Sequence, residues 1–352
     1  MLKAEFAPYT LVFKETARTS REVMNTKQTY FVRVFNEQNP TVAGYGECAL
    51  FRGLSCDDVA NYEEILASAC RDVNMLSQES LRDYPSILFG FETAMNDLRN
   101  GGNLTPFPST WSAGEWGITI NGLVWMGSIE QMSQRIEQKI RQGFRCLKFK
   151  VGGEDFYREF ELLHGVRQRF NDKQLEIRLD ANGAFSPDDA LGKLQKLSTL
   201  HIHSIEQPVK AGNVDLMAKL CAESPIPIAL DEELIGVNSP EKKYKLLDSI
   251  HPQYIILKPA LCGGFSGAME WKSIAELLNI GWWATSALES NVGLNAIAQW
   301  VSTLKAKMPQ GLGTGALYTN NIPSPLVQTG DSLFYDPAQK WDKSVLNNLK
   351  WQ

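Results

Sequence analysis

The chain has 352 residues, of which 43% are hydrophobic and 21% charged, and its formal net charge is −5. These fractions are ordinary for a globular protein. The net negative charge does not indicate a basic surface that would bind nucleic acid or an anionic membrane. No apolar run approaches the roughly 18 residues needed to span a bilayer, and the first residues lack the apolar core of a signal peptide. We therefore expect a cytoplasmic protein that binds a small molecule and has no nucleic-acid or membrane partner.

Cysteine and histidine usage adds little to the functional picture. The six cysteines, at positions 48, 56, 70, 146, 221 and 262, include no close pair. We expect them to be reduced and mostly buried as small hydrophobic side chains. His201 and His203 precede Glu206, but no other residue near them suggests histidine catalysis, which we therefore do not expect.

Residues 4–52 are predicted to form a meander of strands. Aromatic and β-branched residues mark strands over Phe6 to Lys14, Gln28 to Asn36 and Val42 to Leu50. The polar segment 15–27 between the first two strands is too long for a tight hairpin turn. We interpret it as a lid over a site, and we count its Met24 among the candidate substrate-binding residues. An ordinary exposed loop is the alternative.

Residues 57–100 are predicted to be helical. The second helix begins at Pro85 and continues at helical spacing until Gly101 and Gly102 end it. The irregular segment 103–116 follows, and we place a domain boundary there.

From Ile118 onward, short apolar strands alternate with amphipathic helices such as Ser128 to Gln142 and Ser186 to Leu197, which predicts a parallel sheet. The strand ends are spaced by roughly 25 to 30 residues, and about eight such units close a barrel. A doubly wound open sheet would require an early Gly-rich phosphate turn, which the sequence lacks. The predicted strands are Gly117 to Leu123, Cys146 to Lys150, Glu176 to Asp180, His203 to Glu206, Ile228 to Asp231, Tyr254 to Lys258, Trp282 to Ser286 and a weak one near Gly311.

Charged residues lie at the carboxyl ends of consecutive strands of this predicted barrel. In a closed parallel barrel these strand ends converge at one open end. Three carboxylates suit Mg²⁺, with Mn²⁺ as a substitute, and no Cys or His cluster has the spacing of a zinc site. Taken singly, each acid could instead be a helix cap, so the prediction depends on their co-occurrence. The predicted metal ligands are Asp180, Glu206 and Asp231, and the flanking lysines are Lys148, Lys150 and Lys258.

Lys148 and Lys150 are two residues apart in a strand, so their side chains should point to one side and lower each other's pKa. A lysine with a lowered pKa can remove the α-proton of a carboxylate substrate, while a metal ion stabilises the resulting enediolate. Lys150 and Lys258 would approach the substrate from opposite faces, so either can be base or acid. The alternative for Lys148 is a structural partner of one of the acids.

This series of residues resembles the enolase superfamily, in its muconate-lactonising-enzyme-like branch, along nearly the whole chain. The resemblance implies an α/β fold: a (β/α)₇β TIM-like barrel over 117–320 and an α+β capping domain over 1–103 with the lid loop 15–27. Residues 321–352 would pack back on the capping domain. It also implies Lys150 as base and then acid, Lys258 as the stabilising group on the other face, and Lys148 as the residue that tunes Lys150.

Within that branch, the segments 178–182, 285–290 and 311–317 are similar to the o-succinylbenzoate synthase family of menaquinone biosynthesis. Those lyases dehydrate 2-succinyl-6-hydroxy-2,4-cyclohexadiene-1-carboxylate to o-succinylbenzoate. The resemblance implies that Arg178 and Asn182 orient the substrate. Its succinyl carboxylate would find hydroxyl and backbone N–H groups at Thr285, Ser286, Gly311 and Gly313.

Three other functions stay open. An N-succinylamino acid racemase would use the same lysine pair on a succinylated substrate. Dipeptide epimerases typically have an Asp-x-Asp near the eighth strand, and this chain has Gly313 and Gly315 there. A ligand-binding descendant without activity is the third, which the complete set of acids and lysines disfavours. The sequence leaves the oligomeric state open, and a homo-oligomer is compatible with it.

Overall fold

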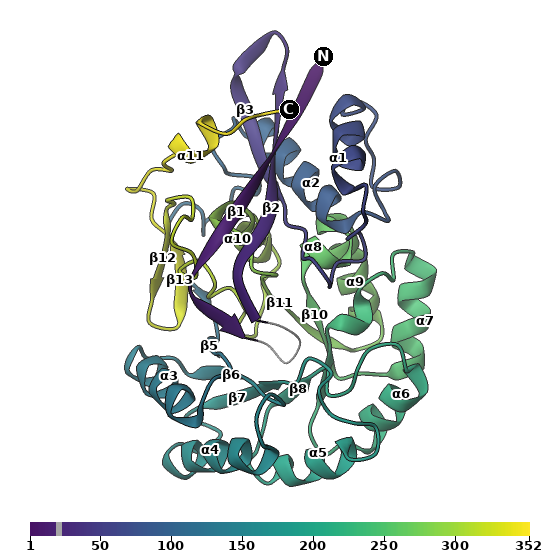
Figure 1. The fold of residues 1–352 in the computed structure, drawn as a ribbon, viewed down its shortest axis with the longest axis vertical. Coiled ribbons are helices and arrows are strands. Elements are labelled where there is room, and N and C mark those ends of the chain that lie inside the picture. Colours follow the sequence, from purple (N-terminus) through teal and green to yellow (C-terminus); the bar gives the residue numbers. More distant parts are fainter. Residues whose placement is uncertain (19–22) are drawn as a thin grey trace.

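The computed structural model of the protein describes residues 1–18 and 23–352. Figure 1 shows two parts: an antiparallel sheet with two helices at one end of the molecule, and a larger parallel sheet surrounded by helices at the other. No helix in these described ranges is long and apolar enough to cross a membrane.

The N-terminal sheet consists of β1 (Leu2–Arg18), β2 (Val23–Asn36) and β3 (Asn39–Cys48), paired antiparallel in that order. Strands β1 and β2 form a long hairpin whose register runs from Leu2 opposite Asn36 to Arg18 opposite Val23, with an irregularity after Val12. Residues 15–18 and 23–27 are therefore strand, where the sequence predicted loop. Backbone pairing accounts for the difference, because a two-stranded ribbon satisfies its N–H and C=O groups whatever its side chains are. Residues 19–22 of the predicted lid lie outside the described residues.

Helices α1 (Tyr62–Arg71) and α2 (Pro85–Arg99) cover one face of this sheet. Helix α2 lies directly on the backbone of β3. A Cβ atom on Gly46 would lie 2.0 Å from the carbonyl oxygen of Gly90, and one on Gly44 would lie 2.0 Å from that of Ala94. Glycine at these positions therefore permits the close approach that brings Phe91 and Ile87 into the buried core with Tyr30.

The larger part contains a parallel sheet in the order β11-β10-β9-β8-β7-β6-β5. Single parallel bridges join Gly311 to Thr285, after β11, and Gln310 to Ile120, before β5. The segment 310–311 thus connects the two edges of the sheet, although it forms bridges rather than the weak strand that was predicted near Gly311. The strands are β5 (Gly122–Val124), β6 (Cys146–Lys150), β7 (Glu176–Asp180), β8 (Ser204–Glu206), β9 (Ile228–Leu230), β10 (Tyr254–Leu257) and β11 (Gly281–Ala284).

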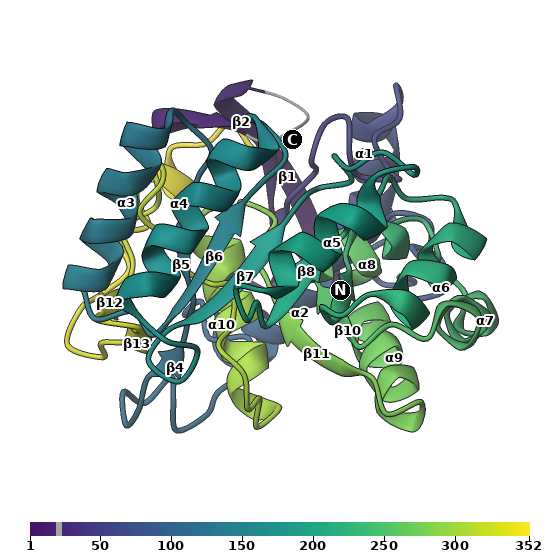
Figure 2. The ribbon, with the colours of Figure 1, turned by 90° about the horizontal axis from the view of Figure 1, so that it is seen from below.

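Helices lie outside this sheet, between successive strands, as Figure 2 shows. Ser128 caps the first of them in a capping box with Gln131, at the place where the sequence predicted a helix start. Apolar side chains from strands and helices form one large buried core, which includes Leu147, Leu179 and Ile255. The helices are α3 (Ile129–Arg141), α4 (Phe156–Arg169), α5 (Ala190–Ser198), α6 (Val214–Glu223), α7 (Pro240–Ile250), α8 (Pro259–Cys262), α9 (Gly264–Leu277) and α10 (Asn291–Thr303).

The C-terminal residues contact both parts. Strands β12 (Leu326–Thr329) and β13 (Ser332–Tyr335) form a small antiparallel sheet with β4 (Ile118–Thr119). After α11 (Ser344–Asn347), Gln352 exchanges backbone hydrogen bonds with Phe6 of β1, and the Trp351 ring packs near Tyr45. The C-terminal end of the chain therefore lies against β1 of the N-terminal sheet.

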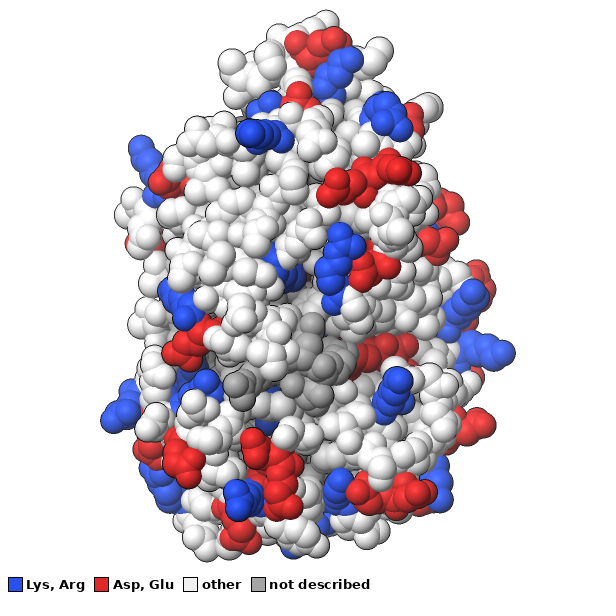
Figure 3. All heavy atoms as spheres, viewed as in Figure 1, with Lys and Arg blue, Asp and Glu red and all other residues white. Residues whose placement is uncertain are grey.

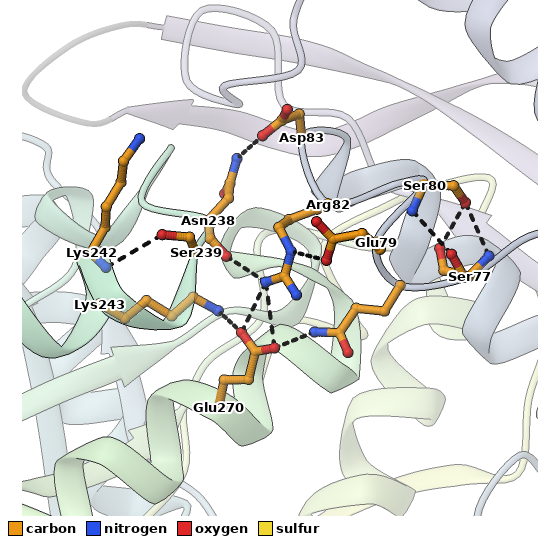
Figure 4. Close-up of polar contacts among 11 residues, drawn as sticks. Ser77, Glu79, Ser80, Arg82, Asp83, Asn238, Ser239, Lys242, Lys243 and Glu270 are labelled. Carbon is orange, nitrogen blue, oxygen red and sulfur yellow. Dashed lines mark hydrogen bonds and ion pairs between the residues drawn. The ribbon is translucent and has the colours of Figure 1, made fainter.

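A cluster of polar side chains joins the loop before α2 to helices α7 and α9 (Figure 4). Glu270 of α9 accepts hydrogen bonds from Gln78 and Arg82 of the loop and, at 2.7 Å, from Nζ of Lys243 in α7. Arg82 also donates to the carbonyl oxygen of Asn238 at 2.8 Å. Lys243 is buried, so Glu270 provides the negative charge that its ammonium requires. The cluster holds the two parts of the fold together.

We expect Glu270→Gln to lower the free energy of unfolding by about 2 kcal/mol, because it leaves a buried ammonium without its charged partner. Burial opposes ionisation of Glu270, but Lys243, Gln78 and Arg82 hold its pKa below the ordinary value. A carboxylate of this kind stabilises the fold above its unfolded pKa, and that stabilisation is lost as the pH falls through the folded pKa. The difference between variant and wild type in urea unfolding should therefore shrink in acid.

The matched control is Glu276→Gln on the same helix, where Glu276 pairs with Lys272 and is half exposed. Such surface pairs contribute about 0.3–0.5 kcal/mol. Equal effects of the two substitutions would contradict the role given to Glu270.

Candidate active site

The predicted metal ligands and lysines come together at the carboxyl end of the parallel sheet. Strand register places Lys150, Asp180 and Glu206 directly beside one another on β6, β7 and β8. Asp231 follows β9 and Lys258 follows β10, so the row continues across the sheet. The carboxylates and Lys148 are almost completely buried, with exposed fractions from 0 to 4%.

Positive and negative groups alternate along this row. Nζ of Lys150 lies 2.5 Å from Oδ2 of Asp180, and Nζ of Lys148 lies 2.8 Å from the same oxygen. Lys148 also donates to Glu206, and Lys258 donates to Asp231 while its Nζ lies 3.9 Å from Oε1 of Glu206. Each buried charge therefore has an opposite charge next to it, which is what makes its burial tolerable.

The prediction that Lys148 has a lowered pKa is wrong for this structure. Burial alone would lower the pKa of Lys148, but Asp180 and Glu206 raise it above its ordinary value. The pKa of Lys258 is also raised, because Asp231 and Glu206 outweigh its burial. Sequence spacing predicts that two ammonium groups repel each other on one side of the strand, but two carboxylates of neighbouring strands are in direct contact with Lys148 and outweigh that repulsion.

The same carboxylates have perturbed pKa values. Burial opposes ionisation of Asp180, yet Lys148 and Lys150 hold its pKa below the ordinary value. Burial and the neighbouring Asp180 raise the pKa of Glu206 well above its ordinary value. A positive charge placed beside these three acids would therefore favour the ionised form of Glu206.

These acids fit a divalent cation by their chemistry. Carboxylate oxygens are the ligands that Mg²⁺ prefers, and Oε1 of Glu206 is buried without a hydrogen-bond partner in the structure as described. Within the described ranges, no three Asp, Glu, His or Cys side chains already surround one point as a metal cluster, and lysine ammonium groups lie between the carboxylates instead.

A cavity opens beside this row, with about 700 Å³ of empty space when the open solvent at its mouth is included. The three lysines and Asn182 form one side, and a largely apolar wall forms another, which suits a small organic anion. The remaining lining residues are Phe51, Leu54, Asn121, Leu123, Trp125, Leu261, Thr285, Ser286, Ala287, Leu288, Gly311, Gly313 and Thr314. On the face seen in Figure 3, acidic and basic side chains are interspersed, without a large area of one sign.

The predicted substrate-binding residues have different locations. Asn182 lines the cavity and accepts a hydrogen bond from Nζ of Lys150 at 2.8 Å. The other cavity-lining members of that set are Thr285, Ser286, Gly311 and Gly313.

Arg178 and Met24 do not line the cavity. Arg178 lies on β7 two residues before Asp180, so its side chain is one layer deeper in the sheet interior. There it donates to Glu176 and to the carbonyl oxygen of Pro309 and lies over the Trp283 ring. Met24 is buried in an apolar cluster behind the cavity wall.

Sequence reasoning missed the apolar wall, including Phe51, Leu54 and Trp125, and also Asn121. Apolar residues of these types occur throughout the core, so nothing in their pattern separates a cavity wall from ordinary packing. Asn121 is the exception, since it interrupts an apolar strand region and its buried Oδ1 lacks a hydrogen-bond partner among the described residues.

The chain is similar to known proteins along most of its length. The family model "Enolase C-terminal domain-like" matches residues 131–343. The chain is 43% identical to an o-succinylbenzoate synthase from Desulfotalea psychrophila, over 92% of this chain and 96% of that protein. The crystal structure of MenC from Desulfotalea psychrophila LSv54 superposes with a TM-score of 0.81 and 41% identity, and covers 95% of this chain and 99% of that one.

More distant relatives match a smaller part of the chain or have a lower sequence identity. An N-succinylamino acid racemase from Thermus thermophilus is 33% identical over 47% of this chain and 42% of its own length. The structure of L-Ala-D/L-Glu epimerase from Bacillus subtilis has 20% identity and a TM-score of 0.78 over 95% of each chain, which shows a common fold.

The family match over residues 131–343, together with the antiparallel N-terminal part and the parallel sheet, shows that the chain is a member of the enolase superfamily. Within that superfamily, the chain belongs to the o-succinylbenzoate synthase family.

Gly311 and Gly313 both line the cavity, but only one of them should tolerate alanine. A Cβ atom on Gly311 would lie 2.4 Å from Oγ1 of Thr285, whereas one on Gly313 would lie 3.5 Å from its nearest neighbour. We expect Gly311→Ala to lower the free energy of unfolding by about 1–3 kcal/mol and Gly313→Ala to have little effect. Urea unfolding measures both, and Thr285→Ala should relieve part of the Gly311→Ala cost. Equal stability of the two alanine variants would contradict this packing.

Proposed function

We propose that the protein converts 2-succinyl-6-hydroxy-2,4-cyclohexadiene-1-carboxylate to o-succinylbenzoate in a Mg²⁺-dependent dehydration. The observation that carries this proposal is the 43% identity, over 92% of the chain, to a relative named o-succinylbenzoate synthase. The three lysines that line one cavity, and the acids in contact with them, support it, because they supply the groups that α-proton removal next to a carboxylate requires.

Asp180, Glu206 and Asp231 would hold Mg²⁺, with Mn²⁺ as a substitute. When bound there, the ion supplies positive charge that polarises the substrate carboxylate and stabilises the negative charge developing on it. Their burial and mutual proximity are what support this assignment.

Lys150 is proposed as the base. Asp180 and Asn182 hold its Nζ at 2.5 and 2.8 Å, so its position toward the cavity is defined. The neutral amine would take the α-proton, and the same group, now an ammonium, would return a proton to the departing hydroxyl. The C–H and C–O bonds break, a ring double bond forms, and water leaves. Aromatisation of the ring favours this direction.

Lys258 and Lys148 are proposed to act without transferring that proton. Lys258 lies at another strand end and lines the cavity, so its ammonium can stabilise negative charge on the substrate. Lys148 bonds to Asp180 and Glu206 and therefore positions these two acids beside Lys150.

The apolar wall completes the site. Phe51, Leu54 and Leu288 would pack against the hydrocarbon ring and exclude water from the reacting atoms. At the polar end, Oγ1 of Thr285 has no hydrogen-bond partner in the described structure and would donate to the succinyl carboxylate.

An N-succinylamino acid racemase is the second candidate, because it would use the same lysine pair, Lys150 and Lys258, on the α-carbon of a succinylated substrate. The similarity to such an enzyme covers only about half of this chain, so it is less supported. For a dipeptide epimerase, Gly313 and Gly315 stand where the acidic pair is expected.

We also infer that the segment 310–311 acts as the eighth strand of a (β/α)₇β barrel. The proposed domain bounds are 1–103, 117–320 and 321–352. A cytoplasmic location and a homo-oligomeric state stay predictions.

An ultraviolet assay of the cyclohexadiene carboxylate with Mg²⁺ tests the proposed reaction. We expect fast conversion by the wild type and a loss of at least about 10³-fold for Lys150→Ala, since general acid–base groups contribute about 10²–10⁴-fold. Lys272→Ala, on the outer helix α9, is the matched control and should keep full activity. A wild type that leaves the substrate unchanged would overturn the proposal, and N-succinylamino acids would then be tested in deuterated water.

Titration calorimetry with Mg²⁺ tests the metal ligands separately. We expect Glu206→Gln to weaken Mg²⁺ binding by about 100-fold, because it removes one of three carboxylate charges. The control is Glu233→Gln, whose carboxylate accepts from Gln207 and Gly212 rather than facing the row. Equal Mg²⁺ affinity of wild type and Glu206→Gln would contradict the assignment.

A further inference from the structure

A second group of buried charges lies behind the cavity wall, and the proposed mechanism does not use it. Lys27 comes from β2, Glu47 from β3 and Glu289 from the turn between β11 and α10. Their exposed fractions are 6, 0 and 0%. The group therefore joins the N-terminal hairpin to the loop that forms the polar end of the cavity.

Glu47 is fully engaged by hydrogen bonds. It accepts from the Thr29 hydroxyl, from the backbone N–H and hydroxyl of Ser290, and from the N–H of Gly293. Ser290 and Gly293 begin α10, so the Glu47 carboxylate lies at the amino end of that helix, where negative charge is stabilised.

Glu289 shapes the cavity wall itself. Its Oε2 accepts from the Ser286 hydroxyl at 2.5 Å. Oγ of Ser286 in turn accepts from the Leu288 N–H at 3.0 Å and from the Thr314 hydroxyl at 2.9 Å. Ser286, Leu288 and Thr314 all line the cavity, so Glu289 contacts this part of the wall through Ser286.

Lys27 is the positive member of the group. Its Nζ is buried without a hydrogen-bond partner in the described structure, and it lies 6.0 Å from the centre of the Phe51 ring, another part of the wall. Burial lowers the pKa of Lys27, while the charges of Glu47 and Glu289 oppose that shift. Oε1 of Glu289 likewise has no hydrogen-bond partner among the described residues. The Lys27 ammonium is therefore not hydrogen-bonded to either carboxylate.

We propose that Lys27 is a positioning residue for the second carboxylate of a dicarboxylate substrate, because its ammonium offsets the two acids that lie behind the polar end of the cavity. Without Lys27, Glu47 and Glu289 would repel an anion bound against Thr285 and Ser286, since Glu289 is in direct contact with Ser286. This inference rests on the proposed function, whose substrate carries a succinyl carboxylate in addition to the reacting one.

The experiment compares two ligands that differ by one charge, at pH 8 with Mg²⁺. One is the product o-succinylbenzoate, and the other is its methyl ester at the succinyl carboxyl. For Lys27→Met we expect binding of the dicarboxylate to weaken by about tenfold and binding of the ester to change by less than about twofold. In turnover assays KM should rise by a similar factor while kcat changes little.

Three further variants separate charge from packing. Lys27→Met combined with Glu289→Gln should recover most of the lost affinity for the dicarboxylate, since it restores the charge balance. Lys14→Met, at an exposed position on the same hairpin, is the matched control and should bind both ligands like wild type. Lys27→Gln repeats the test if Lys27→Met does not fold.

Equal weakening for both ligands, or no recovery in the double variant, would overturn the inference and leave Lys27 a structural residue, while turnover by the wild type would leave the proposed function intact. A wild type that binds neither ligand and forms no product would instead overturn the proposed function, and this inference with it.

Discussion

The alternating row of ammonium and carboxylate groups at the carboxyl end of the sheet is the constraint on which the rest of the site depends. Each of these charges is buried, and an isolated buried charge costs several kcal/mol. The row is tolerated because strand register sets Lys150, Asp180 and Glu206 side by side, and because Lys148 contacts two acids at once. The parallel strands and the helices around them hold these side chains within a few ångströms of one another.

The cavity requires both parts of the fold. The reacting groups come from the parallel sheet, whereas Phe51 and Leu54 follow the last strand of the N-terminal sheet. The cluster around Glu270 fixes one part against the other, and the contact between Glu47 and the start of α10 does so at a second place. Substrate selection is therefore a property of the packed assembly of both parts, and small shifts between them would move the wall relative to the lysines.

Several features could be predicted from sequence because they depend on short-range patterns. Strand–helix alternation predicted the parallel sheet, and charged residues at strand ends predicted which side chains would meet. The predictions failed where long-range packing decides. The hairpin is longer than its polar residues suggested, Arg178 lies a layer below the cavity, and the pKa of Lys148 is raised by acids from two other strands.

The sequence by itself determined the residue types and the edge of the sheet at which they gather, because apolar periodicity and the alternation of strands with helices are local patterns. Only the tertiary structure decided which ammonium contacts which carboxylate, which apolar side chains become a wall, and that Lys27 lies behind it. The physical reason is that electrostatic energy depends on distance and burial. Both quantities are set by residues far apart in the chain, so no local pattern contains them.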